Sequence, residues 1–151
     1  IMVGTPAASL EVNNIPPLVD FFSIGSNDLT QYTLACDRGN EQLGDLFQAL
    51  DPAVLRSIRH VIDTAHAAGK WVGVCGELAG QRLAIPVLLG LGLDEFSMTP
   101  RAIPEDQQVI RSLTRSRAQA IADHALSLPT VAEVKGYLGS VLEELEPPEA
   151  D

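Results

Sequence analysis

A polar segment at residues 23–31 carries the side chains best suited to chemistry in this sequence. It begins at the end of an apolar run, and Gly25 allows the backbone to turn tightly there. Asn27 and Asp28 then offer an amide and a carboxylate, and a carboxylate is a ligand that Mg²⁺ prefers. The alternative is that Ser26, Asn27 or Asp28 caps the helix that follows, because all three residue types are favoured N-caps. These residues alone leave both interpretations open.

Arg38 lies ten residues further on, in the loop sequence Asp37-Arg38-Gly39-Asn40. The fork of its guanidinium group matches the oxygen atoms of a phosphate or a carboxylate. The alternative is an ordinary surface ion pair between Arg38 and the neighbouring Asp37. Arg38 is therefore a candidate for binding an anionic ligand.

Cys75 stands near glycines in the sequence Gly73-Val74-Cys75-Gly76-Glu77, where a ligand can approach closely. A thiol in such a place could act as a nucleophile or as a proton donor. The alternative is a buried, inert cysteine, which is common for this residue type. Glu77 could orient the thiol or cap the next helix. Cys36 follows an apolar pair and is expected to pack in the core.

Four short apolar runs must position these residues, and each is followed by turn residues and then a helical pattern. The runs lie at residues 1–3, 19–24, 71–75 and 95–98. Their hydrophobicity is typical of parallel strands buried on both faces, so the sequence predicts a parallel α/β architecture. Ligands bind at the carboxyl ends of such strands, where residues 25–28 and 75–77 are expected to lie.

The clearest helix is predicted from Pro52 to Gly69, with Asp51 as its N-cap. Shorter or later helices are predicted at residues 83–89, 104–115, 115–128 and 130–145, the last with the capping-box spacing of Thr130 and Glu133. Two arrangements satisfy this order: a small open sheet, or half of a (β/α)8 barrel. A complete barrel needs about 250 residues, so 151 residues could supply four of its eight strands.

The composition excludes several classes of function. The 151 residues hold 20 acidic and 10 basic side chains, and the formal net charge is −10. This charge argues against nucleic-acid binding through a basic patch and against docking to an anionic membrane. No apolar run is long enough to insert into a membrane, and two cysteines make no disulfide framework, so a cytoplasmic location is expected. Because a strand pattern begins at Ile1, the chain is expected to be a piece of a longer protein.

The run from Asp20 to Asn40 closely resembles the signature of phosphoenolpyruvate (PEP)-utilising enzymes. Within them it is most similar to the Enzyme I family, the PEP–protein phosphotransferases of bacterial sugar phosphotransferase systems. Residues 74–80 and 92–98 resemble the same family. The resemblance implies that residues 1–145 are the C-terminal half, strands 5–8, of a PEP-binding (β/α)8 TIM barrel, followed by C-terminal helices. Residues 146–151 are expected to form a frayed acidic tail.

The resemblance also implies a role for each candidate residue. Asp28 would be a ligand of Mg²⁺, Asn27 and Arg38 would bind PEP, and Cys75 would be the general acid. In the implied reaction, a histidine of a separate N-terminal domain takes the phosphoryl group of PEP and passes it to the histidine phosphocarrier protein. Cys75 would protonate the departing enolate, which then leaves as pyruvate.

The sequence departs from the family pattern at Gly4, where the family has a glutamate that is the second protein ligand of Mg²⁺. The N-terminal domain and the first four barrel strands are also missing from these 151 residues. The sequence therefore predicts that this chain alone does not turn over PEP. Because the family's barrel domain is dimeric and the outer strands would have unpaired edges, a homodimer is expected.

Two alternatives remain open. One is a sister enzyme, pyruvate phosphate dikinase or PEP synthase, which shares the barrel and the positions of Asn27, Asp28 and Cys75. The other is a non-catalytic half-barrel that acts as a dimerisation or regulatory module. Gly4 is the strongest support for the second alternative.

Overall fold

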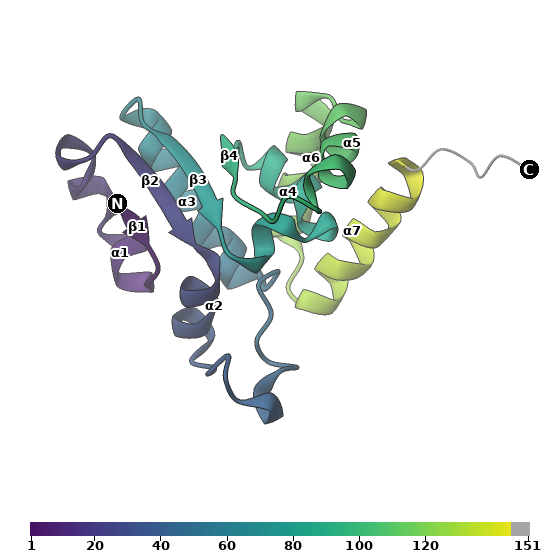
Figure 1. Ribbon diagram of the computed structural model, residues 1–151, viewed down its shortest axis with the longest axis horizontal. Helices are drawn as coiled ribbons and strands as arrows, with labels where there is room; N and C mark the ends of the chain where they lie inside the picture. Colours follow the sequence, from purple (N-terminus) through teal and green to yellow (C-terminus); the bar gives the residue numbers. More distant parts are fainter. Residues whose placement is uncertain (146–151) are drawn as a thin grey trace, which may run out of the picture.

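Four parallel strands form one sheet in the computed structural model, which describes residues 1–145 (Figure 1). The strands lie side by side in chain order, which confirms the predicted parallel α/β architecture. They are β1 (Met2–Val3), β2 (Phe21–Gly25), β3 (Trp71–Cys75) and β4 (Glu95–Phe96). The helices that connect and follow them are α1 (Pro6–Leu10), α2 (Ser26–Leu34), α3 (Pro52–Ala67), α4 (Ile85–Gly90), α5 (Ile103–Ser112), α6 (Arg115–Ser127) and α7 (Val131–Leu145).

Helix α3 begins at the predicted residue, Pro52, and ends at Ala67, two residues before the predicted Gly69. Asp51 caps it by accepting a 2.8 Å hydrogen bond from the backbone N–H of Ala53, and Pro52 occupies the first turn. Just after the helix, Gly69 adopts a φ of +70°, a left-handed conformation that glycine takes without strain. The helix buries one stripe of seven residues: Pro52, Val54, Leu55, Ile58, Val61, Ile62 and Ala65.

This stripe packs against one face of the sheet to form the core. In Figure 1, α3 lies behind β2 and β3, and Phe22, Ile24, Val72 and Val74 of these strands are buried in the same cluster as the stripe. The alternation of side chains along a strand places the residues between them on the opposite face. The sheet is therefore closely packed on the α3 face.

The opposite face of the sheet carries large apolar side chains that stay exposed. Met2 is 56% exposed, and Phe21 and Trp71 are 39% and 41% exposed. The rings of Phe21 and Trp71 stack in parallel, with their centroids 4.3 Å apart. The prediction that residues 1–3 form a buried strand is wrong for Ile1 and Met2, and only Val3 is buried. Met2 is exposed because it lies on this face, beside Ser23.

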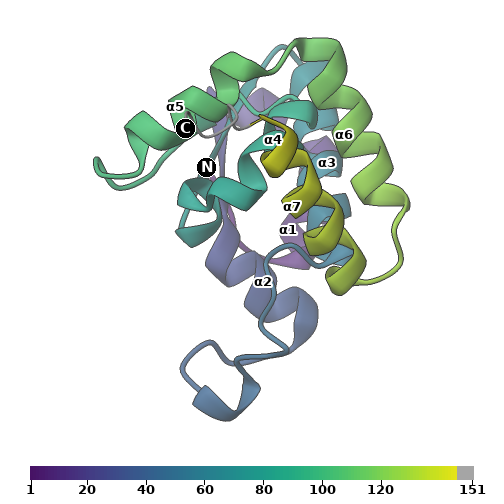
Figure 2. The same ribbon diagram turned by 90° about the vertical axis from the view of Figure 1, so that its right-hand side faces the viewer.

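The C-terminal helices differ from their predicted boundaries by a few residues. Residues 82–84 form a 3-10 turn, and α4 begins just before Pro86 because a proline in a helix interior would lack its hydrogen bond. Thr130 caps α7 by accepting a 3.3 Å hydrogen bond from the N–H of Glu133. Figure 2 shows α6 and α7 packed together. The predicted tail at residues 146–151 lies outside the described residues.

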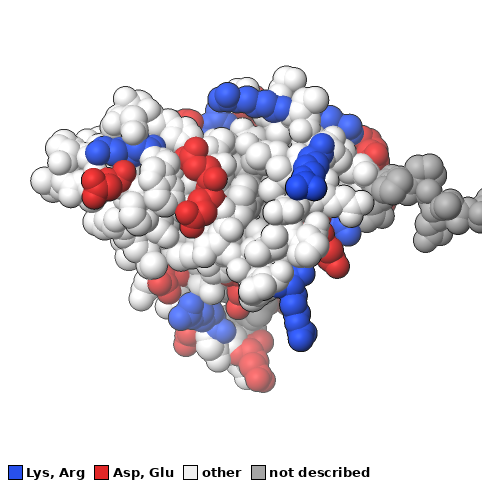
Figure 3. Space-filling model, turned by 45° about the horizontal axis from the view of Figure 1, so that its top comes forward, with Lys and Arg blue, Asp and Glu red and all other residues white. Residues whose placement is uncertain are grey.

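No helix among residues 1–145 is both long enough and apolar enough to cross a lipid bilayer. On the face shown in Figure 3, Lys and Arg side chains are spread among acidic and uncharged ones. This face therefore presents single basic side chains and no continuous basic surface to an anionic ligand.

Candidate functional site

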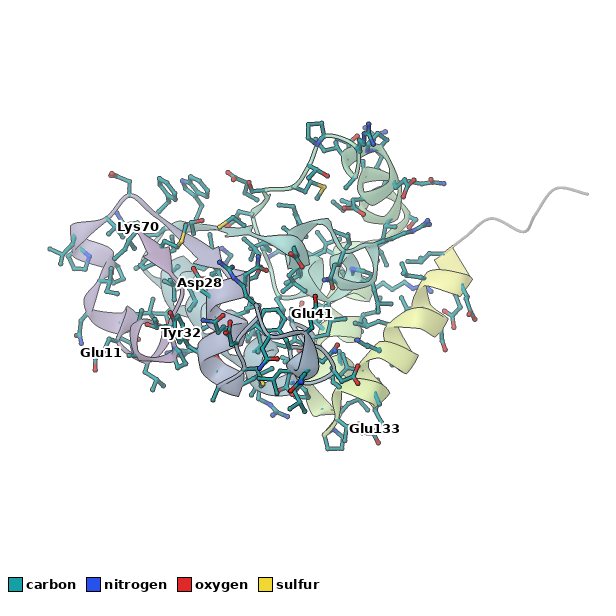
Figure 4. All side chains as sticks on the ribbon, turned by 60° about the horizontal axis from the view of Figure 1, so that its bottom comes forward. Glu11, Asp28, Tyr32, Glu41, Lys70 and Glu133 are labelled. Atoms are coloured by element: carbon teal, nitrogen blue, oxygen red, sulfur yellow. The ribbon has the colours of Figure 1, made fainter. Side chains whose placement is uncertain are left out.

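The candidate residues meet where β2 and β3 end. Gly25, the last residue of β2, pairs with Cys75, the last residue of β3. Helix α2 begins directly after Gly25, so Asn27 and Asp28 lie in its first turn. Figure 4 shows Asp28 at the start of α2, to the left of the middle of the view. These residues lie together because parallel strands have their carboxyl ends at the same edge of the sheet.

The interpretation of residues 26–28 as helix caps is wrong. The N-cap of α2 is Gly25, and no side chain makes a capping hydrogen bond there. The hydroxyl of Ser26 instead donates a 2.8 Å hydrogen bond to the backbone carbonyl of Cys75. Asp28 lies in the first turn, where its negative charge interacts favourably with the helix dipole.

Two hydrogen bonds fix the start of α2 to the loop after β3. One is the bond from Ser26, and in the other the side-chain oxygen of Asn27 accepts from the backbone N–H of Glu77 at 3.3 Å. Gly76 lies between the two contacts with a φ of +102°, and a Cβ atom there would be 2.5 Å from Ser26 Oγ. Only glycine fits this position without displacing its neighbours. The contact of Glu77 runs through its backbone, and its exposed side chain neither caps a helix nor bonds Cys75.

Asp28 presents its two carboxylate oxygens in different directions. Oδ1 lies 3.5 Å from the guanidinium of Arg38. Oδ2 faces the ends of β1 and β2, because a Cβ atom on Gly4 or Gly25 would lie 3.7 or 3.8 Å from it. Both charged side chains are about half exposed, at 47% for Asp28 and 53% for Arg38. One oxygen of Asp28 is thus paired with a cation, and the other is open towards two glycines.

Arg38 is held over the site by its own backbone. Its N–H donates a 3.2 Å hydrogen bond to the side-chain oxygen of Gln31 on α2. The suggested surface pair of Arg38 with Asp37 is wrong. The carboxylate of Asp37 accepts a 2.9 Å hydrogen bond from the N–H of Gly39, which closes a local turn and leaves the guanidinium directed to Asp28.

The thiol of Cys75 is partly exposed and makes two weak hydrogen bonds. Its sulfur accepts from the hydroxyl of Ser23 at 3.7 Å and donates to the carbonyl of Ile24 at 3.6 Å. The interpretation of Cys75 as a buried cysteine is wrong, because the residue is only partly buried. Cys36, by contrast, is only 6% exposed, as predicted for a core residue.

Within residues 1–145, no three side chains of His, Cys, Asp or Glu are grouped closely enough to hold a metal ion. The candidate site offers a single carboxylate, Asp28. The three histidines, His60, His66 and His124, lie on α3 and α6. A cavity of about 520 Å³ lies among α3, α4, α5 and α6, and none of the candidate residues lines it.

Sequence reasoning missed three residues around the site. Ser23 contacts the thiol, Gln31 holds the backbone of Arg38, and Lys135 of α7 hydrogen-bonds Gln48 beside a cavity of about 120 Å³ that Asn27 also lines. Ser23 could have been found from strand alternation, since it lies two residues before Gly25 on the same face. Lys135 is 87 residues from its partner, so no local pattern indicates the contact.

Most of the chain matches a known protein family. Residues 1–115 match the family described as "PEP-utilising enzyme, PEP-binding domain". Because the match covers most of the chain, the protein belongs to this family.

Three similar proteins are each named phosphoenolpyruvate-protein phosphotransferase. The protein of Haemophilus influenzae is 49% identical over 144 residues, which cover 95% of this chain and 25% of the relative. The protein of Buchnera aphidicola (Acyrthosiphon pisum) is 50% identical over 134 residues, 89% of this chain and 24% of the relative. That of Geobacillus stearothermophilus is 50% identical over 138 residues, 91% and 24%. The chain thus spans about a quarter of the length of these curated relatives, and the resemblance seen in the sequence is confirmed.

Proposed function

We propose that this chain supplies the PEP-binding and proton-donating part of a PEP–protein phosphotransferase. The observation that carries the proposal is the direct link between two strand ends. Ser26 and Asn27 at the start of α2 are hydrogen-bonded to Cys75 and Glu77, so a ligand held by α2 would lie beside the thiol. The family of the chain and the names of its relatives support PEP as that ligand.

The chain would act as the C-terminal half, strands 5–8, of a (β/α)8 barrel. The parallel order of β1 to β4 supports this, because barrel strands follow one another in chain order. The exposed face with Met2, Phe21 and Trp71 supports it too, since the inner face of a barrel is filled by side chains from all its strands. Four further β/α units would cover this face in a protein of the relatives' length.

Asp28 supplies one carboxylate, which is the smallest number of carboxylates that usually holds a Mg²⁺ ion. This ion is often held by one or two carboxylates together with substrate oxygens, and Oδ2 of Asp28 is open for such a contact. Gly4 provides no second carboxylate. Asp28 would hold the ion together with PEP, and the bound ion would offset part of the charge on the phosphoryl group. We therefore expect weak Mg²⁺ binding that depends on PEP.

Arg38 would bind the phosphate or carboxylate of PEP. Among the described residues its guanidinium pairs with Asp28 at 3.5 Å, and it remains half exposed, so several N–H donors can face a ligand. Asn27 uses its side-chain oxygen for the contact with Glu77, which leaves the amide N–H₂ to donate to the ligand. Together the two side chains would orient PEP over the ends of β2 and β3.

Cys75 would complete the reaction by donating a proton. After the phosphoryl group leaves PEP, the S–H bond breaks and a C–H bond forms at the terminal carbon of the enolate. The bonding electrons remain on sulfur as a thiolate, and pyruvate is released. The phosphoryl group would pass to a histidine outside these residues and then to the histidine phosphocarrier protein. These transfers would take place in the cytoplasm and would serve sugar uptake.

Calorimetric titration of the chain with PEP in the presence of Mg²⁺ tests the proposal. We expect saturable binding that is at least about tenfold weaker in Arg38→Ala, because a charge-assisted hydrogen bond contributes about 1.5–3 kcal/mol. A steady-state assay of the same chain should detect no pyruvate, since the accepting histidine is not part of it. Sustained pyruvate release would contradict the prediction that the chain alone is inactive.

The non-catalytic dimerisation module remains the second candidate, because Gly4 provides no carboxylate beside Asp28. Sedimentation at several concentrations separates the two. The homodimer we propose should be seen in either case, whereas stable dimers without any PEP binding would favour the module. A mass of one chain at every concentration would contradict the dimer.

A further inference from the structure

We propose that Ser23 is a positioning residue for Cys75. Its hydroxyl donates a hydrogen bond that stabilises the negative charge left on the Cys75 sulfur after the proton has been given away. The inference rests on the proposed role of Cys75 as the proton donor. It is carried by the contact between Ser23 Oγ and Cys75 Sγ, 3.7 Å apart on the partly buried side of the sheet.

The strand register explains how the two side chains meet. Ser23 in the middle of β2 lies directly beside Gly73 of β3, and Cys75 is two residues further along β3 on the same face. Because Gly73 has no side chain, nothing on β3 separates the hydroxyl from the thiol. The other strand neighbour of Ser23 is Met2 of β1, whose side chain offers no competing acceptor of similar strength.

The two hydrogen bonds at Sγ respond differently when the proton is lost. The bond from sulfur to the carbonyl of Ile24 requires the thiol proton and disappears with it. The bond from Ser23 has the hydroxyl as donor, so it remains and becomes charge-assisted on the thiolate. Ser23 therefore favours the state in which Cys75 has given its proton away.

Other charged side chains surround this part of the sheet. Asp28 and Arg38 lie at the start of α2 and in the loop after it, Glu77 follows β3, and Glu95 of β4 lies against Gly73. These groups are the same in every Ser23 variant. A comparison among such variants therefore isolates the hydroxyl.

The test is the pH dependence of alkylation by iodoacetamide, measured on the full 151-residue chain with Cys36→Ala so that one thiol reacts. Loss of a hydrogen bond that strengthens on ionisation should move the midpoint for Ser23→Ala up by about half to one pH unit. Alkylation below the midpoint should then be about 3–10-fold slower, with the same limiting rate at high pH. Ser112→Ala is the matched control, because it removes a 2.7 Å hydroxyl bond within α5.

Ser23→Thr and Ser23→Val form a second pair of variants. The two new side chains have the same shape, but only threonine carries a hydroxyl. The proposal expects Thr to keep the midpoint of the parent chain and Val to shift it as Ala does. Equal midpoints for Thr and Val would overturn it, and so would a loss of folding in Ala and Val but not in Thr, which would make the role structural. The assay contains no PEP, so a failure of the chain to bind PEP would not affect the outcome.

Discussion

Gly4→Glu should restore a two-carboxylate metal site. A Cβ atom on Gly4 would lie 3.2 Å from Cβ and 3.7 Å from Oδ2 of Asp28, so a glutamate side chain there would begin beside the open oxygen. The backbone of Gly4 does not have a positive φ, and a side chain is therefore tolerated. The start of α2 must move by only a few tenths of an ångström to make room.

The gain can be worked out from simple electrostatics. A carboxylate about 2 Å from a divalent ion gains about 4 kcal/mol at the dielectric constant of water. Repulsion between two carboxylates about 4 Å apart takes back about 1 kcal/mol, and fixing the glutamate side chain costs about 1.5–2 kcal/mol more. The net gain of about 1–1.5 kcal/mol corresponds to about tenfold tighter Mg²⁺ binding.

Calorimetric titration of the chain with MgCl₂ measures this gain. Gly4→Gln is the control, because it has the shape of glutamate without the charge and should bind Mg²⁺ no better than the parent chain. Adding Asp28→Asn to Gly4→Glu should abolish the gain. Equal affinities for Gly4→Glu and Gly4→Gln would refute the reasoning and show that more than one ligand has been lost from the site.

Three further predictions concern stability. Gly76→Ala should lower the free energy of unfolding by about 1–3 kcal/mol in urea titrations, because alanine is strained at a φ of +102° and meets Ser26. Gly136→Ala is its control on α7, where a Cβ meets nothing, and a gain of about 0.5–1 kcal/mol is expected; equal effects of both would contradict the account. Ile58→Ala should cost about 2–5 kcal/mol by leaving a cavity under the sheet, and a loss below 1 kcal/mol would argue against the packing described. Burial raises the pKa of Asp106 above its usual 3.8, and Glu105 adds to the effect, so its stabilising contribution is present at low pH and is lost as pH rises through the raised pKa. Asp106→Asn should therefore melt at a higher temperature at pH 7, with a difference that shrinks towards pH 4, and a lower melting temperature at pH 7 would be the contrary result.

The elements near the site could be predicted because their signals are local. Residues 71–75 form an apolar run that ends at glycine, and α3 carries its cap, its proline and its buried stripe within its own sequence. The exposure of Met2 and Trp71 could not be predicted in this way. An apolar side chain on a strand predicts that this face of the sheet is buried. It does not tell whether the residues that bury it belong to this chain segment.

The candidate site was predictable to the same extent. That Asp28 and Cys75 lie at one edge follows from the parallel order of the strands. The strand order does not predict the hydrogen-bond partner of each side chain. The bond from Ser26 to the Cys75 carbonyl, for example, joins residues that are 49 apart in the sequence. The capping interpretation failed because α2 already begins at Ser26, whose hydroxyl donates to the neighbouring strand instead of accepting from an N–H of its own helix.

Protection of Cys75 from alkylation tests the central proposal most directly, which is that PEP binds beside this thiol. The rate of reaction with iodoacetamide is measured in the Cys36→Ala chain at increasing PEP concentration, with Mg²⁺ present. The account predicts a saturable fall in the rate, which inorganic phosphate at the same concentration does not reproduce and which Arg38→Ala weakens. A rate that stays constant up to the highest PEP concentration would contradict it.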